Sequence, residues 1–156
     1  MMELRESFEM ALAEFGRMAG LELALADGQC NFTVDGNVEV EIDYIEEAQV
    51  AIAWAVIGSA PEDGYAGSRA KTLLALNALN APNGGFSLSL DPEARRFVVH
   101  DNRPAELFDS ADKVAAWIGA LVELVHNIRE DFAMRFPGPD ILPGDEEEDA
   151  EEGEEA

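Results

Sequence analysis

The sequence predicts an α+β fold with the element order α-β-β-β-α-β-β-α, in which helices pack on a twisted antiparallel sheet. Short runs of alternating apolar and polar residues are separated by tight turns, a pattern typical of antiparallel strands that neighbour one another. Longer segments at the start, middle and end of the chain carry apolar residues three and four positions apart, as amphipathic helices do. A chain of 156 residues suits a single domain with one core.

The first predicted helix covers residues 3–19. Its apolar residues recur at steps of three and four, so they lie on one face of the helix. Gly20 suits the end of this helix, because glycine readily adopts the left-handed conformation that closes a last turn. The apolar face consists of Leu4, Phe8, Ala11, Leu12, Phe15 and Met18.

A β-hairpin follows in the segment CNFTVDGNVEVEIDYI. Apolar and polar residues alternate over residues 30–34 and again over residues 38–44. The Asp35-Gly36-Asn37 sequence between them favours a tight turn.

A third strand is predicted over residues 49–57, and neither of its faces is polar. Bulky residues alternate with alanines, and we expect the bulky face to supply the core. The alanine face is then an exposed apolar strip, which suggests a partner-binding surface. The alternative is that the chain's own helices cover both faces of the sheet. The two sets are Val50, Ile52, Trp54 and Val56 on one face and Ala51, Ala53 and Ala55 on the other.

The second half of the chain repeats these patterns. A helix is predicted at about residues 68–80, where Asn77 interrupts the apolar run LLALNAL. Two strands follow at residues 86–90 and 96–100. The Asp91-Pro92-Glu93 sequence between them suits a turn, because proline fixes the required backbone angle.

The last predicted helix begins at Asp109 or Ser110, residues that cap helices well, and reaches about Phe136. Residues 137–156 contain three prolines and the run DEEEDAEEGEEA. This composition is too polar to bury a core. We therefore expect a folded domain at residues 1–136 and a disordered tail at residues 137–156.

The chain is strongly acidic, with a formal net charge of −23. Without the nine acidic residues of the final run, −14 remains. Such a surface repels phosphate backbones and anionic lipids, so we expect neither nucleic-acid nor membrane binding. The N-terminus lacks the features of a secretory signal, and the longest apolar stretch is about half of a membrane span. A cytoplasmic protein is expected.

Candidate nucleophiles and bases are few and isolated. Cys30 is the only cysteine, which rules out an internal disulfide, and its inward-facing strand position is typical of an inert thiol. His100 and His126 show no metal-ligand spacing. The sequence therefore predicts neither a catalytic site nor a metal site built on these residues.

Carboxylates are abundant, and three of them share one strand face. Glu39, Glu41 and Asp43 alternate along the predicted hairpin, so they form either a cation site or, as the alternative, a solvated face. No calcium loop, phosphate-binding loop or dinucleotide motif occurs in the sequence. No cofactor is expected.

Four segments in this order and spacing resemble the class I type III secretion chaperones, the family of Tir-type effector chaperones. The segments are EFGRMAGLEL, GQCNFTVDGNVEVEI, LLALNAL followed by GGFSLSLD, and LFDSADKVAAWIGALVEL. The resemblance covers about residues 4–136 and leaves the acidic tail outside the family pattern.

This resemblance implies the same α-β-β-β-α-β-β-α fold in a non-enzymatic cytoplasmic homodimer. Such a chaperone binds the N-terminal segment of a secreted effector in extended form and keeps it soluble and export-competent. Components of the secretion apparatus are further candidate partners. The implied dimer interface comprises Leu73, Leu74, Asn77, Phe86 and Leu88, and the implied partner-binding residues are Phe8, Leu12, Phe15, Ala51, Ala53 and Ala55. Asn77 either forms hydrogen bonds across the two-fold axis of the dimer or lies at the solvent-exposed edge of its helix.

Three other interpretations stay open. A regulatory protein-binding domain resembling the YbjN group would share the fold and have no secretion role. An acidic nucleic-acid mimic would capture a basic protein and lose it at high salt. An unrecognised enzyme would depend on Cys30, His100 or His126.

Overall fold

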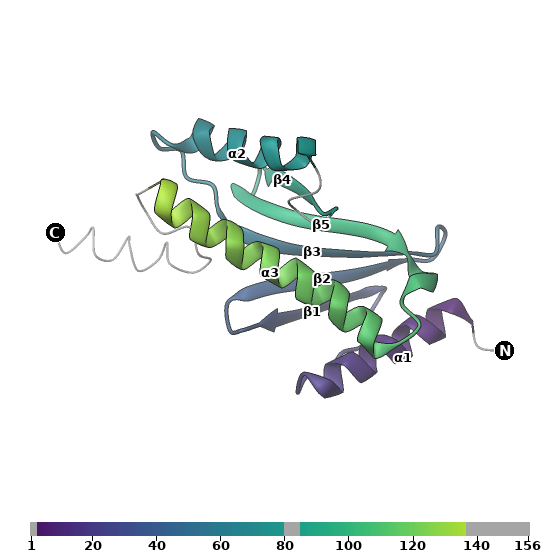
Figure 1. Ribbon diagram of the computed structural model, residues 1–156. Helices are drawn as coiled ribbons and strands as arrows, with labels where there is room; N and C mark the ends of the chain where they lie inside the picture. The colour runs from purple at the N-terminus through teal and green to yellow at the C-terminus, as the bar shows by residue number, and fades with distance from the viewer. Residues whose placement is uncertain (1–2, 80–84, 137–156) are drawn as a thin grey trace.

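The computed structural model describes residues 3–79 and 85–136, which form a five-stranded sheet with helices on one face (Figure 1). The predicted α+β fold and its order of elements are confirmed, with one additional short 3-10 helix. The helices are α1 (Leu4–Met18), α2 (Ala66–Leu79), η1 (Ala105–Leu107) and α3 (Ala111–Arg135). The strands are β1 (Gln29–Val34), β2 (Val38–Ile45), β3 (Val50–Ser59), β4 (Ser87–Asp91) and β5 (Arg96–Pro104).

The sheet is antiparallel throughout and has the order β1-β2-β3-β5-β4. The predicted hairpin forms as expected, with Val34 paired to Val38 across the turn. β5 lies between β3 and β4 in the sheet. After β3 the chain therefore forms α2 and the edge strand β4, and only then returns to place β5 beside β3. β5 extends to Pro104, beyond the predicted end at residue 100, because its last residues pair with β3 although they lack apolar alternation.

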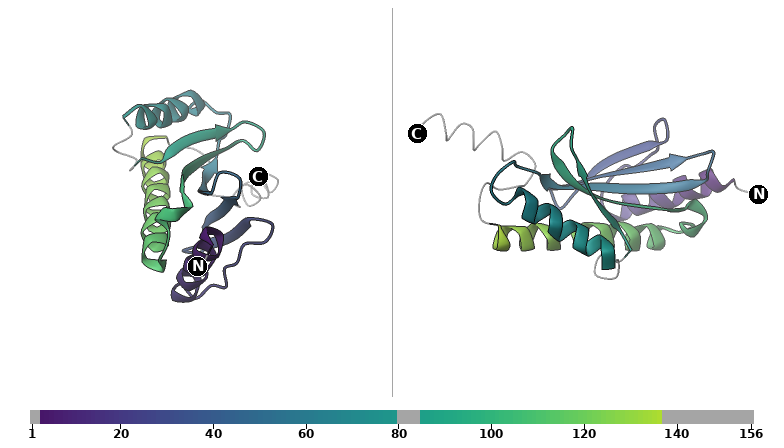
Figure 2. Two further views of the ribbon diagram at one scale, coloured as in Figure 1. Left: turned by 90° about the vertical axis from the view of Figure 1, so that its right-hand side faces the viewer. Right: turned by 90° about the horizontal axis from the view of Figure 1, so that it is seen from above.

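All three α-helices lie on the same side of the sheet (Figure 2, right). α3 crosses β3 and β5, α1 packs beside α3 and η1, and α2 packs along β4. Ser110 caps α3 as predicted, since its hydroxyl accepts a hydrogen bond from the backbone N–H of Lys113. The opposite face of the sheet has no helix among the described residues, so the alternative with both faces covered is wrong.

The face assignment of β3 was predicted the wrong way round. Ala51, Ala53 and Ala55 are 0% exposed and face α3, whereas Ile52 and Trp54 are half-buried on the side without helices. Small side chains let a helix approach the sheet closely, and this close packing buries the alanines. They therefore belong to the core and form no exposed strip.

Arg129 fixes α3 to an irregularity in β3. The β3–β5 register shifts between Val56 and Gly58, which marks a β-bulge. The buried guanidinium of Arg129 donates from Nε to the carbonyl of Ile57 at 2.5 Å and from Nη2 to the carbonyl of Val56 at 3.1 Å. These bonds satisfy carbonyls that the bulge leaves inside the protein, where unpaired polar groups are costly.

A second buried arginine connects the start of α2 with the end of α3. The Arg69 side chain is 1% exposed and donates two hydrogen bonds to Asp63, at 2.8 and 3.1 Å. Its guanidinium also lies 5.9 Å from the ring centroids of both Tyr65 and Phe136. This arginine holds the pKa of Asp63 below its usual value through their hydrogen bonds.

Asn77 connects α2 to the outer edge of β4. Its Nδ2 donates to the carbonyl of Leu88 at 2.6 Å, and its Oδ1 accepts from the backbone N–H of Leu88 at 2.7 Å. Since β4 is the last strand of the sheet, these backbone groups point away from β5 and need a partner. The side-chain amide supplies one, which explains an asparagine within an apolar helix face.

We predict that Asn77→Leu lowers the free energy of unfolding by about 1–3 kcal/mol, because it leaves the two backbone groups of Leu88 unpaired. Urea denaturation at one fixed protein concentration measures the change. Lys71→Leu, at an exposed position of the same helix, is the matched control and should stay within about 0.5 kcal/mol of the parent. Equal losses for both variants would contradict this role of Asn77.

Candidate functional site

An apolar groove lies between the end of α1, the β1–β2 turn and the middle of α3. Its volume is about 580 Å³. We call it the α1–α3 groove, and its wall includes Phe15, Leu21 and Val34 on one side and Ile118, Gly119 and Val122 of α3 on the other. A groove with this lining suits apolar side chains of a partner.

Gly119 is the least expected residue of the α1–α3 groove. Glycine within a helix costs about 1 kcal/mol relative to alanine, and Gly119 lies well inside the 25-residue α3. A Cβ atom built at this position would meet no heavy atom within 4 Å. The packing of the described chain therefore gives no reason for glycine here, whereas close approach by another molecule would.

A polar contact crosses the rim of the α1–α3 groove. The Nε2 atom of His126 on α3 lies 3.1 Å from Oδ2 of Asp35 in the β1–β2 turn. Both side chains are substantially exposed, so this pair is a weak surface contact. It joins the two walls of the groove at its end.

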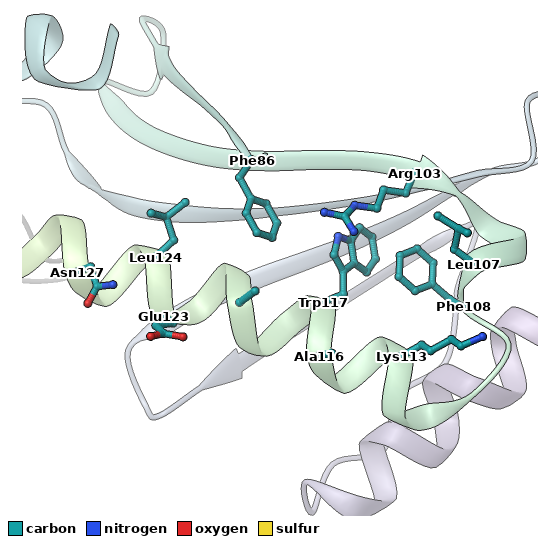
Figure 3. A pocket seen from close by; sticks show the side chains of 11 residues that line it. Phe86, Arg103, Leu107, Phe108, Lys113, Ala116, Trp117, Glu123, Leu124 and Asn127 are labelled. Atoms are coloured by element: carbon teal, nitrogen blue, oxygen red, sulfur yellow. The ribbon is translucent and has the colours of Figure 1, made fainter. Parts of the chain in front are cut away.

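A second groove lies on the other flank of α3, between this helix and β5. We call it the α3–β5 groove; its volume is about 520 Å³. Figure 3 shows Phe86, Arg103 and Trp117 converging between the helix and the sheet, with Phe108 beside Trp117. The rings of Phe108 and Trp117 stack at 4.2 Å.

Asp101 organises the polar part of the α3–β5 groove. Its Oδ2 accepts hydrogen bonds from Trp117 Nε1 at 2.8 Å and from Arg103 Nε at 2.5 Å. Arg103 in turn lies over the ring of Phe86, 5.9 Å from its centroid. This second groove is therefore more polar than the α1–α3 groove, and its arginine is already paired.

The predicted partner-binding residues do not form one accessible surface. Phe8 and Leu12 are 0% exposed, and the Phe8 ring packs against Tyr44 and Phe108 in the core. Like the three alanines of β3, they are covered by the chain itself. Phe15 is the exception, since it is half-buried in the wall of the α1–α3 groove.

The residues predicted for a dimer interface gather around α2 and β4. Leu73, Phe86 and Leu88 are buried within the chain, whereas Leu74 is 65% exposed. Asn77 already bonds Leu88 of its own chain with both ends of its amide, a contact that neither of its two predicted roles includes. The predicted interface itself stays a prediction.

The residues with potential for catalysis are dispersed. Cys30 is buried as predicted, and this burial raises the pKa of its thiol. Ser89 Oγ lies 2.9 Å from His100 Nε2 on the side of the sheet without helices. No described carboxylate bonds the other ring nitrogen of His100, so the pair lacks the third group that orients a catalytic base.

Clusters of metal ligands and helices of membrane-spanning length are both absent from the described parts of the chain. No group of three or more histidine, cysteine, aspartate or glutamate side chains there is arranged to hold a metal ion. Within residues 3–79 and 85–136, no helix has the length and apolar character needed to cross a bilayer.

The fold is similar to those of several solved chains. It matches a chain of the ExsC–ExsE complex with a TM-score of 0.68 and 17% identity, covering 81% of this chain and 93% of that one. It matches a chain of the HopA1–SchA chaperone–effector complex with a TM-score of 0.66 and 19% identity, covering 83% and 99%.

A third similar chain comes from the heterodimeric ExoU–SpcU complex of the type III secretion system of Pseudomonas aeruginosa. The TM-score is 0.58 at 19% identity, with 77% of this chain and 93% of that chain covered. No curated protein matches the sequence significantly.

The sequence itself matches the model of the Tir chaperone protein (CesT) family over residues 10–129. This match covers most of the chain and includes parts of both α1 and α3, the helices that form the walls of the α1–α3 groove. The chain therefore belongs to the Tir chaperone protein (CesT) family.

Proposed function

We propose that this protein is a cytoplasmic type III secretion chaperone, without enzymatic activity, that binds the N-terminal segment of a secreted effector. The segment is held in extended form, which keeps it soluble and competent for export. Family membership supports a chaperone role, and two similar folds come from complexes described as chaperone–effector or type III secretion complexes.

The observation that carries this proposal is the α1–α3 groove with Gly119 in its wall. The groove is apolar and open, and Gly119 leaves space that its own chain does not fill. Apolar side chains of an effector segment would be buried there, removing the surface that causes aggregation of an unfolded chain. Binding of this kind needs neither nucleotide nor metal.

We further propose that the protein acts as a homodimer with α2 and β4 at the interface. Leu74 and Leu90 support this, because they are 65% and 50% exposed on these two adjoining elements. Large apolar side chains exposed in this way favour burial against a second copy, and a two-fold axis would bring each patch against itself. Two copies would also present two α1–α3 grooves to one effector chain.

The first prediction from this proposed function concerns the α1–α3 groove. Gly119→Leu should fill the groove and reduce effector capture at least about tenfold, since a leucine side chain occupies space needed for apolar contact. The same change should leave the fold intact and raise helix stability by up to about 1 kcal/mol. The variant should therefore capture less effector although the folded protein is no less stable.

The measurement is a pull-down from the source cytosol at high salt, followed by limited proteolysis and mass spectrometry of the bound material. Ala120→Leu is the matched control, because it adds the same side chain one position along, in the α3–β5 groove. A protected segment near the N-terminus of a larger protein, lost only with Gly119→Leu, supports the proposal. Loss with Ala120→Leu alone would move the site to the other groove. Capture of nothing at high salt, with only basic proteins bound at low salt, would overturn the function.

The second prediction concerns the dimer. Leu74→Asp should convert a dimer into a folded monomer. The dimer should be lost because the substitution places a charge in an apolar interface. The fold should survive because, in the monomer, the aspartate side chain is exposed to solvent. Multi-angle light scattering gives the mass, and circular dichroism checks the fold. Leu107→Asp, at a 48% exposed leucine of η1, is the control and should remain dimeric. A monomeric parent protein would show the homodimer proposal to be wrong.

A further inference from the structure

The face of the sheet opposite the helices carries a charged and aromatic surface. On this face, Glu41 of β2 lies opposite Trp54 of β3, and Trp54 lies opposite His100 of β5. A hollow of about 340 Å³ next to Trp54 is lined by residues that include Thr33, Glu39, Glu41 and Arg96. No described helix covers it, in contrast to the alanine face of the same strand.

Trp54 is held in place in a way that presents its ring. Its Nε1 donates to Glu41 Oε2 at 2.7 Å, which fixes the edge of the indole. The guanidinium of Arg96 lies 5.3 Å from the ring centroid, so the chain already uses this ring as a platform for a planar cation. An indole ring next to carboxylates is therefore a chemical environment that suits a guanidinium group.

Asp43 adds a carboxyl group that its own chain does not compensate. It follows Glu41 at the next outward position of β2, and its Oδ1 is sealed from solvent with no hydrogen-bond partner among the described residues. Burial first, and then the neighbouring Glu41, raise the pKa of Asp43 to about 6. The other charged or titratable groups on this face are Glu39, Asp91, Arg96 and His100, and Arg96 pairs with Asp91 at 3.6 Å.

An organic cation fits this surface better than a metal ion. The described residues contain no cluster of three metal ligands, whereas two adjacent carboxyl groups and an indole ring match a guanidinium, which bonds carboxylates in a plane and stacks on aromatic rings. Charge complementarity points the same way, since the protein has a net charge of −23.

We infer that the side of the sheet without helices binds an arginine-bearing extended segment of a partner protein, with the guanidinium between Trp54 and the carboxyl groups of Glu41 and Asp43. Trp54, Glu41 and Asp43 lie on the face of the sheet away from α3, and none of them lines the α1–α3 groove, although Thr33 borders both hollows. The inference therefore does not depend on the effector-binding proposal, and either can fail alone.

The test is a titration of the full-length protein, at physiological salt, with the blocked peptide GRVRG and in parallel with GKVKG. Two-dimensional NMR follows the indole N–H resonances of the two tryptophans. We expect the Trp54 resonance to move saturably with the arginine peptide. The Trp117 resonance should stay in place, because Trp117 belongs to α3 and is buried on the helix side of the sheet. The lysine peptide should bind more weakly, since its ammonium lacks the planar fork.

The variant is Glu41→Gln combined with Asp43→Asn, which keeps side-chain shape and lets Gln accept the bond from Trp54. We expect about a tenfold loss of affinity for the arginine peptide, the usual effect of removing charge-assisted hydrogen bonds. The matched control, Glu106→Gln combined with Glu130→Gln, removes the same charge from exposed positions on η1 and α3 and should bind like the parent.

Calorimetry in buffers of different ionisation enthalpy gives an independent readout. A bound guanidinium lowers the pKa of Asp43, so binding should release protons near pH 6 and none near pH 8. An unmoved Trp54 resonance, an equal loss in the matched control, or equal affinity for the lysine peptide would each overturn the inference. An unmoved Trp54 resonance would exclude binding at this site. Either of the other two outcomes would show that the peptide is attracted only by the overall negative charge of the protein.

Discussion

The close packing of α3 on the alanine row of β3 is the contact on which the rest of the structure depends. Ala51, Ala53 and Ala55 have no exposed surface, and their small size lets the 25-residue helix lie directly on the sheet. Arg129 then secures the same helix to the β3 bulge. Larger residues in the row would lift α3 and disrupt both grooves at its flanks, because each groove has this helix as one wall.

The two faces of the sheet consequently serve different purposes. The helix side combines the core with two grooves, of which the apolar α1–α3 groove retains space around Gly119. The other side presents Trp54 between carboxyl groups and Arg96. The two proposed sites would combine apolar burial on one face with electrostatic recognition on the other, and salt would weaken chiefly the electrostatic contact. A partner segment that wraps around the domain would meet both surfaces in turn.

Local patterns in the sequence predicted the fold well, because hairpin alternation and helical periodicity are properties of neighbouring residues. The facing of β3 was not predictable in this way. Both of its faces are apolar, so only the position of α3, more than 50 residues later in the chain, decides which face is core. Phe8 and Leu12 lie on the single apolar face of α1, and local patterns do not show whether this face packs on its own chain, as Phe8 does on Tyr44 and Phe108, or on a partner. Gly119, in contrast, could have been recognised as a candidate site residue from the sequence. A glycine within a strong helical pattern lowers the stability of the helix, so its presence there needs an explanation.

The position of α3 as the last of the described elements has a consequence for biosynthesis. Until the ribosome has released residues 111–135, the alanine face of β3 has no helix on it, and the core lacks the buried side chains of α3. The α1–α3 groove joins residues 15–35 with residues 115–126, so it comes into existence only when the last helix docks. A nascent chain therefore depends on contacts distant in sequence, and no partner can use this groove before α3 has been synthesised and has docked.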